Sequence, residues 1–153
     1  MSQKPGSLYL GQRLDPGSYE ATDERLELDT DRLTTHGVIV GMTGSGKTGL
    51  GIVLLEEILA SGIPALILDP KGDMGNLLLN FPEFRAADFE PWVDEGQAKR
   101  EGLEPDALAE KEAGKWKGGL ERSGVSPERM RRVTEGVDIR ILTPGSTAGI
   151  PVN

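Results

Sequence analysis

The sequence of 153 residues predicts an α/β fold built around one strand–helix–strand unit, and three observations support this prediction. A β-branched run, Val38 to Val40, is typical of a buried strand. A glycine-rich turn follows it, and then Leu50, Val53, Leu54 and Ile58 recur at helical spacing. A second apolar run, Ala65 to Leu68, completes a unit of about thirty residues, for which we expect a parallel strand pair with a right-handed crossover.

The segment before this unit, residues 1–36, predicts a short β-hairpin that leads into the main sheet. Leu26 and Leu28 alternate with charged residues, as in a half-buried strand. The run Asp15-Pro16-Gly17-Ser18 is a strong turn signal upstream of them. We therefore treat residues 1–36 as an N-terminal hairpin and residues 37–153 as one partial domain.

Within the partial domain, residues 80–135 are rich in charge and predict a solvated helical insertion. One helix is expected from Asp106 to about Arg122. A second is capped by Ser126 and has Pro127 at its first position. After the insertion, the alternation from Val137 to Leu142 predicts a further strand, so the parallel sheet would be incomplete within this chain.

The composition excludes several classes of protein. The chain has no cysteine and one histidine, His36, which excludes thiolate metal sites, disulfide scaffolds and cysteine nucleophiles, and argues against a histidine-based metal site or catalytic triad. The net charge of −8 disfavours a wide basic face for nucleic acid. The longest near-apolar stretch is too short to span a bilayer and no signal peptide is visible, so we expect a cytoplasmic protein without membrane contact.

The glycine-rich turn matches the pattern G-x-x-x-x-G-K-[ST] and predicts a nucleotide-binding loop. Glycines let the loop curl so that its backbone amides form an anion cradle, and the following helix adds its positive N-terminal end. A lysine in this position reaches the β- and γ-phosphates of ATP, and the hydroxyl after it ligates Mg²⁺. The eight residues are Gly41, Met42, Thr43, Gly44, Ser45, Gly46, Lys47 and Thr48. Lys47 would stabilise phosphate charge, and Thr48 would be the metal ligand.

A second constellation, Asp69-Pro70-Lys71-Gly72-Asp73, follows the second predicted strand. Ligands bind at the carboxyl edge of open parallel sheets, so Asp69 has a possible water-mediated contact to Mg²⁺ or the γ-phosphate. The same residues are also ordinary turn chemistry, and the sequence leaves the two interpretations equal.

The charged insertion offers weaker candidates for contacts with DNA. Trp92 and Trp116 have the chemistry to stack on bases, although small local cores explain them more simply. The basic residues of this region alternate with glutamates, which favours a solvated helix face over phosphate contacts. They are Lys115, Lys117, Arg122, Arg129, Arg131 and Arg132.

The run from His36 to Leu79 resembles the HerA/FtsK superfamily of P-loop ATPases, and most closely the HerA-like type with the helicase HerA central domain. The loop Gly41 to Thr48, paired with Asp69 to Asp73 about twenty residues later, carries the resemblance. It implies a RecA-like core in a hexameric ring with ATP at the subunit interfaces. It also implies ATP hydrolysis coupled to translocation on, or unwinding of, double-stranded DNA, with a possible nuclease partner.

The sequence departs from this family pattern after residue 80. No apolar run ending in Asp-Glu follows, so the Walker B strand and its catalytic glutamate are not found, and the catalytic residue is unknown. We therefore expect the N-terminal part of a longer ATPase, which binds ATP without hydrolysing it alone. Two other interpretations stay open, namely a small P-loop phosphotransferase acting on a nucleotide or metabolite, and a nucleotide-binding module without turnover.

Overall fold

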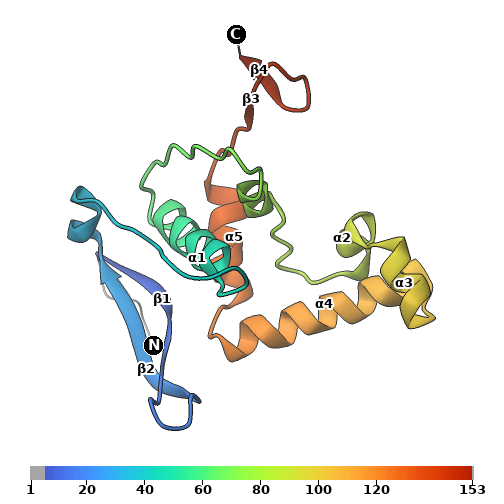
Figure 1. Ribbon diagram of the computed structural model, residues 1–153, viewed down its shortest axis with the longest axis horizontal. Coiled ribbons are helices and arrows are strands. Elements are labelled where there is room, and N and C mark those ends of the chain that lie inside the picture. Colours follow the sequence, from blue (N-terminus) through green and yellow to red (C-terminus); the bar gives the residue numbers. More distant parts are fainter. Residues whose placement is uncertain (1–5, 153) are drawn as a thin grey trace. The chain divides into compact units, whose positions relative to one another are not determined.

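The computed structural model describes residues 6–152, which form a mixed α/β chain (Figure 1). The chain divides into two compact units. The first comprises residues up to Asn80 together with those from Arg132 onward, and the second comprises Phe81–Arg131. The domain boundaries expected from the sequence stay a prediction, and the two units are described separately below.

The first unit begins with an antiparallel strand pair where the hairpin was expected. Strand β1 (Ser7–Leu14) pairs with β2 (Ala21–Asp29). The turn between them is closed by Asp15, whose Oδ1 accepts hydrogen bonds from the amides of Gly17 and Ser18 at 3.0 and 2.8 Å. These bonds to the charged form, led by that from Ser18, hold the pKa of Asp15 below its ordinary value.

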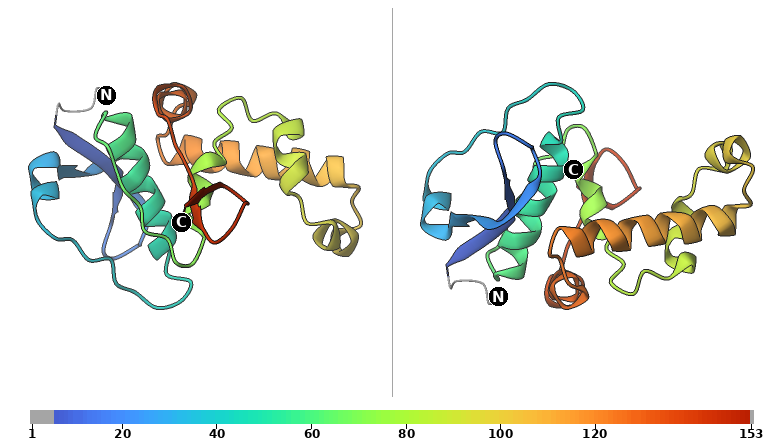
Figure 2. Two further views of the ribbon diagram at one scale, coloured as in Figure 1. Left: turned by 90° about the horizontal axis from the view of Figure 1, so that it is seen from above. Right: turned by 90° about the horizontal axis from the view of Figure 1, so that it is seen from below.

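Helix α1 (Lys47–Ala60) begins directly after the glycine-rich turn and lies beside the β1–β2 pair (Figure 2). Leu8 and Tyr9 of β1 are buried, as is Leu77 of the short 3-10 helix η2 (Met74–Leu78) that packs on α1. The apolar spacing that predicted α1 is therefore confirmed, and its ends agree with the glycine loop and with Ser61-Gly62.

The parallel strand pair expected on either side of α1 is not formed. Among residues 6–152 the sheets are β1–β2 and the parallel pair β3–β4, and neither includes Val38 to Val40 or Ala65 to Leu68. Val38 and Val40 are 84% and 82% exposed, and Leu66 and Leu68 are each 86% exposed. Two runs this short make few ladder hydrogen bonds and need covering layers on both faces, which the described chain does not provide.

The second unit is helical. It contains α2 (Ala86–Phe89), the 3-10 helix η3 (Glu90–Trp92), α3 (Glu95–Glu101) and α4 (Pro105–Arg122). Its small core is built by Ala98 of α3 together with Leu108, Ala109 and Ala113 of α4. The charged helical character expected for this region is confirmed, and Pro105 occupies the first turn of α4, where its missing amide costs nothing.

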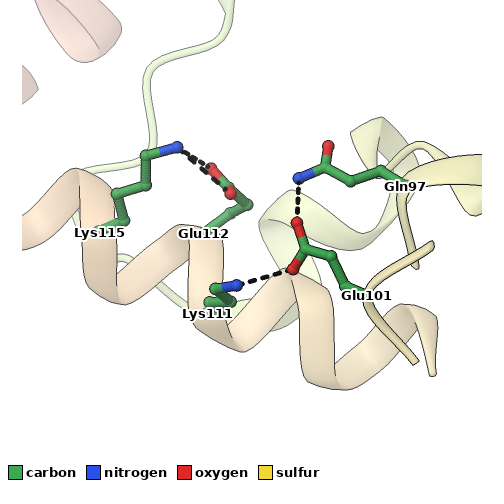
Figure 3. A network of polar contacts seen from close by, with 5 residues as sticks. All are labelled: Gln97, Glu101, Lys111, Glu112 and Lys115. Carbon is green, nitrogen blue, oxygen red and sulfur yellow. Dashed lines mark hydrogen bonds and ion pairs between the residues drawn. The ribbon is translucent and has the colours of Figure 1, made fainter. Parts of the chain in front are cut away.

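The ion pair between Lys111 of α4 and Glu101 of α3 connects the two helices, and further polar contacts lie within each helix (Figure 3). Lys111 donates to Glu101 at 2.7 Å, and Gln97 donates to the other oxygen of the same carboxylate at 3.0 Å. Lys115 pairs with Glu112 one turn earlier on α4. The polar face of α4 is thus a set of local ion pairs, as a solvated helix predicts.

Helix α5 (Pro127–Gly136) starts where the sequence signals placed it, and the Ser126 hydroxyl accepts from the Arg129 amide at 3.3 Å. The prediction of a strand from Val137 to Leu142 is wrong except at Leu142, which begins strand β3 (Leu142–Pro144). Strand β3 pairs in parallel with β4 (Ile150–Val152). In the described part of the chain no helix is both long and apolar enough to cross a membrane.

Candidate functional site

The glycine-rich loop has a backbone that only glycine adopts easily. Gly44 and Gly46 have φ angles of +80° and +86°, in the left-handed region, and Gly46 is the N-cap of α1. Between them the Ser45 amide donates to the Met42 carbonyl at 3.2 Å and closes a tight turn. The loop therefore curls onto the start of α1, as the sequence pattern requires.

The start of α1 is electrostatically suited to an anion. The first turn contains no acidic residue, and the helix contributes its positive dipole end and unpaired amides. Lys47 is the first residue of the helix, and its Nζ folds back to donate to the Met42 carbonyl at 2.5 Å. An incoming phosphate would replace this neutral acceptor with a charged one, which is the stronger partner for an ammonium group.

Gly41 meets a different constraint from Gly44 and Gly46, because the loop folds over it. A Cβ at this position would overlap the Ser45 hydroxyl, and it would lie 3.4 Å from Cγ of Lys47. The first glycine of the motif is thus favoured by close approach to the Ser45 side chain, and the later two by backbone angle.

Thr48 connects the loop to the Asp69–Asp73 segment. Its hydroxyl donates to Oδ2 of Asp73 at 3.2 Å, and the Lys71 ammonium donates to the same oxygen at 2.5 Å. Lys71 is the largest cause of the lowered pKa of Asp73, with a smaller contribution from Thr48, and Asp73 in turn raises the pKa of Lys71. Asp73 is therefore a charged carboxylate beside the hydroxyl that the sequence assigns to magnesium.

Asp69 is engaged in closing its own loop. One of its oxygens accepts from the Gly72 amide and the other from the Met74 amide, both at 2.8 Å. Met74 begins η2, which the buried Leu77 anchors against the unit. Asp69 thus has the hydrogen bonds of a turn residue, the second of the two interpretations that the sequence left equal. The residue of this segment that contacts the glycine-rich loop is Asp73, through Thr48.

These donors fit a magnesium ion held together with a nucleotide. Mg²⁺ prefers oxygen ligands and is commonly held by one or two carboxylates plus substrate phosphates. Thr48 and Asp73 supply one hydroxyl and one carboxylate that are already adjacent. Over residues 6–152 no group of three or more acidic, cysteine or histidine side chains forms a metal cage.

Two features, one in the site and one on the helix that follows it, were not found from the sequence. The first is the contact between Thr48 and Asp73, which depends on how the loop from Asp69 folds back. The second is Glu57, which lies on the apolar side of α1 and is buried, with Oε2 accepting from the Tyr9 amide at 2.7 Å. Its position seven residues after Leu50, on the apolar stripe, was the available signal.

The candidates for contacts with DNA lie in exposed or locally paired positions. Trp92 and Trp116 are both largely exposed, so the local cores expected around them are not formed. Arg131 pairs with Glu83, and Lys115 pairs with Glu112, in agreement with the solvated-face interpretation. His36 is exposed in the segment before the loop.

Comparison with known proteins identifies the family. No solved structure matches the chain. The family model described as the helicase HerA central domain matches residues 14–116, a range that contains the whole of the glycine-rich loop and the segment from Asp69 to Asp73. The match covers more than half of the chain, and the chain belongs to the family of the helicase HerA central domain.

Proposed function

We propose that this chain binds ATP with Mg²⁺ at the loop Gly41 to Thr48, and that the intact protein couples ATP hydrolysis to movement along double-stranded DNA. The observation that carries the binding proposal is the hydrogen bond from Thr48 to Asp73 beside the curled loop. The match to the HerA central domain supports the motor activity, since that family comprises ATP-dependent DNA translocases and helicases.

The geometry supports the following chemical roles. Backbone amides of the loop and of the first turn of α1 would bind the phosphate oxygens, and Lys47 would exchange the Met42 carbonyl for the β- and γ-phosphates. Thr48 and Asp73 would hold Mg²⁺, which neutralises phosphate charge when bound. Asp69 would act on the site by fixing the loop that carries Asp73.

The remaining parts of the proposal are supported by the family alone. They are a RecA-like core, a hexameric ring with ATP between subunits and a nuclease partner. A cytoplasmic location is proposed from the sequence, which shows no signal peptide. Because the sequence shows no apolar strand ending in Asp-Glu after residue 80, we further propose that this chain binds ATP without turnover.

Binding is tested by calorimetric titration of the 153-residue chain with ATP in magnesium buffer. Lys47→Ala removes a charge-assisted contact of about 1.5–3 kcal/mol, so the dissociation constant should rise about tenfold to a hundredfold. Lys117→Ala, which removes an exposed lysine of α4, is the control and should bind as the unmodified chain does. Equal affinity of the unmodified chain and Lys47→Ala would reject the nucleotide site.

Turnover is tested separately by measuring phosphate release with and without blunt double-stranded DNA. We expect neither condition to give release above that of a Lys47→Ala sample. DNA-stimulated release by this chain would refute binding without turnover, whereas phosphate transfer to a small metabolite would favour the phosphotransferase alternative.

A further inference from the structure

One carboxylate oxygen of the candidate site accepts two hydrogen bonds, one from a hydroxyl and one from an ammonium group. Oδ2 of Asp73 accepts from the Thr48 hydroxyl and from the Lys71 ammonium. The first donor is the hydroxyl to which the motif assigns magnesium, and the second already carries a positive charge. The ammonium of Lys71 thus neutralises Asp73 next to the place where magnesium would do so.

The position of Lys71 is set by its loop as well as by its partner. Asp69 accepts hydrogen bonds from the amides of Gly72 and Met74, and these two bonds close the turn that contains Lys71 and Asp73. This closure places Asp73 against α1 and keeps Lys71 two residues away on the same turn. Nothing comparable holds the side chains of most exposed ion pairs, which lose entropy on pairing.

Asp73 creates an electrostatic problem for nucleotide binding without metal. Its carboxylate is charged, and it lies beside the hydroxyl that follows the phosphate-binding lysine. The phosphates of a bound nucleotide and the Asp73 carboxylate would repel each other, and a cation between them would offset this repulsion. Magnesium is that cation in a metal–nucleotide complex, and in its absence the only cation bonded to Asp73 among the interactions described is Lys71.

We propose that Lys71 is a stand-in cation for this site, which neutralises Asp73 when magnesium is absent and yields the carboxylate when a magnesium–nucleotide complex binds. The proposal rests on the proposed function, because it requires the triphosphate to occupy the loop. Lys71 is a positioning residue here, and its side chain is 76% exposed, so it can move into solvent when Asp73 turns to the metal.

The proposal predicts a change in metal dependence rather than a general loss of binding. In Lys71→Ala the uncompensated Asp73 repels metal-free ATP, so affinity measured in EDTA should fall about tenfold. Affinity measured with excess Mg²⁺ should change less than about twofold, because the metal compensates Asp73 instead. Lys71→Arg should keep both affinities, since it retains a cation on the turn.

A double variant makes the test specific to the pair. Lys71→Ala combined with Asp73→Asn removes the cation and the anion together, so the metal-free affinity should return to that of the unmodified chain. The same double variant should gain less affinity from Mg²⁺, because a carboxylate ligand is lost.

The matched control is the Arg85–Asp88 pair of the second unit, whose side chains are 71% and 20% exposed against 76% and 25% for Lys71 and Asp73. Arg85→Ala should leave both affinities unchanged. Circular dichroism of every variant verifies folding before titration.

Three results would overturn the proposal. If Lys71→Ala bound ATP with unchanged affinity in EDTA, Lys71 would form only an ordinary surface ion pair. If Lys71→Ala lost the same affinity with and without Mg²⁺, Lys71 would be a plain phosphate contact. A chain that binds magnesium–ATP but no metal-free ATP would show that Lys71 does not replace the metal. Failure of the nucleotide site itself is recognised differently, since the unmodified chain and Lys47→Ala would then bind magnesium–ATP equally.

Discussion

The carboxylate of Glu57 on α1 accepts a hydrogen bond from the backbone amide of Tyr9 on β1, with a donor–acceptor distance of 2.7 Å. Both residues are buried, at 4% exposure each. The bond joins the helix that follows the glycine-rich loop to the first strand of the hairpin.

Removing the acceptor should destabilise the first unit. In Glu57→Ala the Tyr9 amide loses the partner that Glu57 provides, and such a loss costs about 1–3 kcal/mol. Glu57→Gln keeps an acceptor oxygen and should cost less. Urea unfolding followed by circular dichroism measures both changes in the free energy of unfolding. Glu110→Ala, which replaces an exposed glutamate of α4, is the control; a loss as large in Glu110→Ala as in Glu57→Ala would contradict the prediction.

Two glycines, Gly46 at the loop and Gly51 in the second turn of α1, isolate the effect of the backbone angle. A Cβ would meet nothing within 4 Å at either position, but only Gly46 has a positive φ, of +86°. Gly46→Ala should therefore disfavour the loop by about 1–2 kcal/mol and weaken ATP binding about fivefold to thirtyfold. Gly51→Ala lies inside α1, beyond its first turn, and should leave binding unchanged while stabilising the helix by up to about 1 kcal/mol. The comparison is made by calorimetric titration and thermal unfolding, and equal affinities of the two variants would contradict it.

Helices α1, α4 and α5 were predictable because their signals are local, whereas the shorter α2 and α3 were not predicted. Pro127 after Ser126 marked the start of α5, and the spacing from Leu50 to Ile58 marked α1. The signal for the hairpin was local as well, since the Asp15 turn closes through its own side chain.

The strands around the loop were not predictable in the same way. A β-branched run specifies that a segment is suited to a buried sheet, but pairing requires partners elsewhere. Val38 to Val40 and Ala65 to Leu68 have that composition and no ladder in either described sheet. The same limit applies to the site, where the motif identified Thr48 but its contact with Asp73 depends on the fold of another loop.

Asp69 offers a test between loop closure and metal contact. Its two oxygens accept from the Gly72 and Met74 amides, so Asp69→Ala should accelerate hydrogen exchange at those two amides, measured by NMR. Loss of a charge-assisted acceptor of about 1.5–3 kcal/mol corresponds to about tenfold to a hundredfold faster local opening. The Ser61 amide at the end of α1 is the internal reference and should not change. If hydrogen exchange at the two amides were unchanged in Asp69→Ala, and ATP binding by this variant no longer depended on magnesium, Asp69 would instead be assigned to the metal.

The pKa of Glu101 should be lower than its ordinary value, chiefly because Lys111 donates to its charged form and secondarily because Gln97 does (Figure 3). A carboxyl group whose pKa is lower in the folded chain than in the unfolded chain stabilises the fold above the unfolded pKa, and that stability is lost as pH falls through the folded pKa. Lys111→Met should therefore raise the pKa of Glu101 and lower the free energy of unfolding of the second unit at pH values above about 4, and the difference from the unmodified chain should shrink as the pH falls further. Carboxyl-carbon NMR titration measures the pKa, and Lys99→Met removes a cation of α3 that does not contribute to this shift. If Lys99→Met moved the Glu101 titration as far as Lys111→Met, the shift would come from net charge and not from the hydrogen bond between α3 and α4.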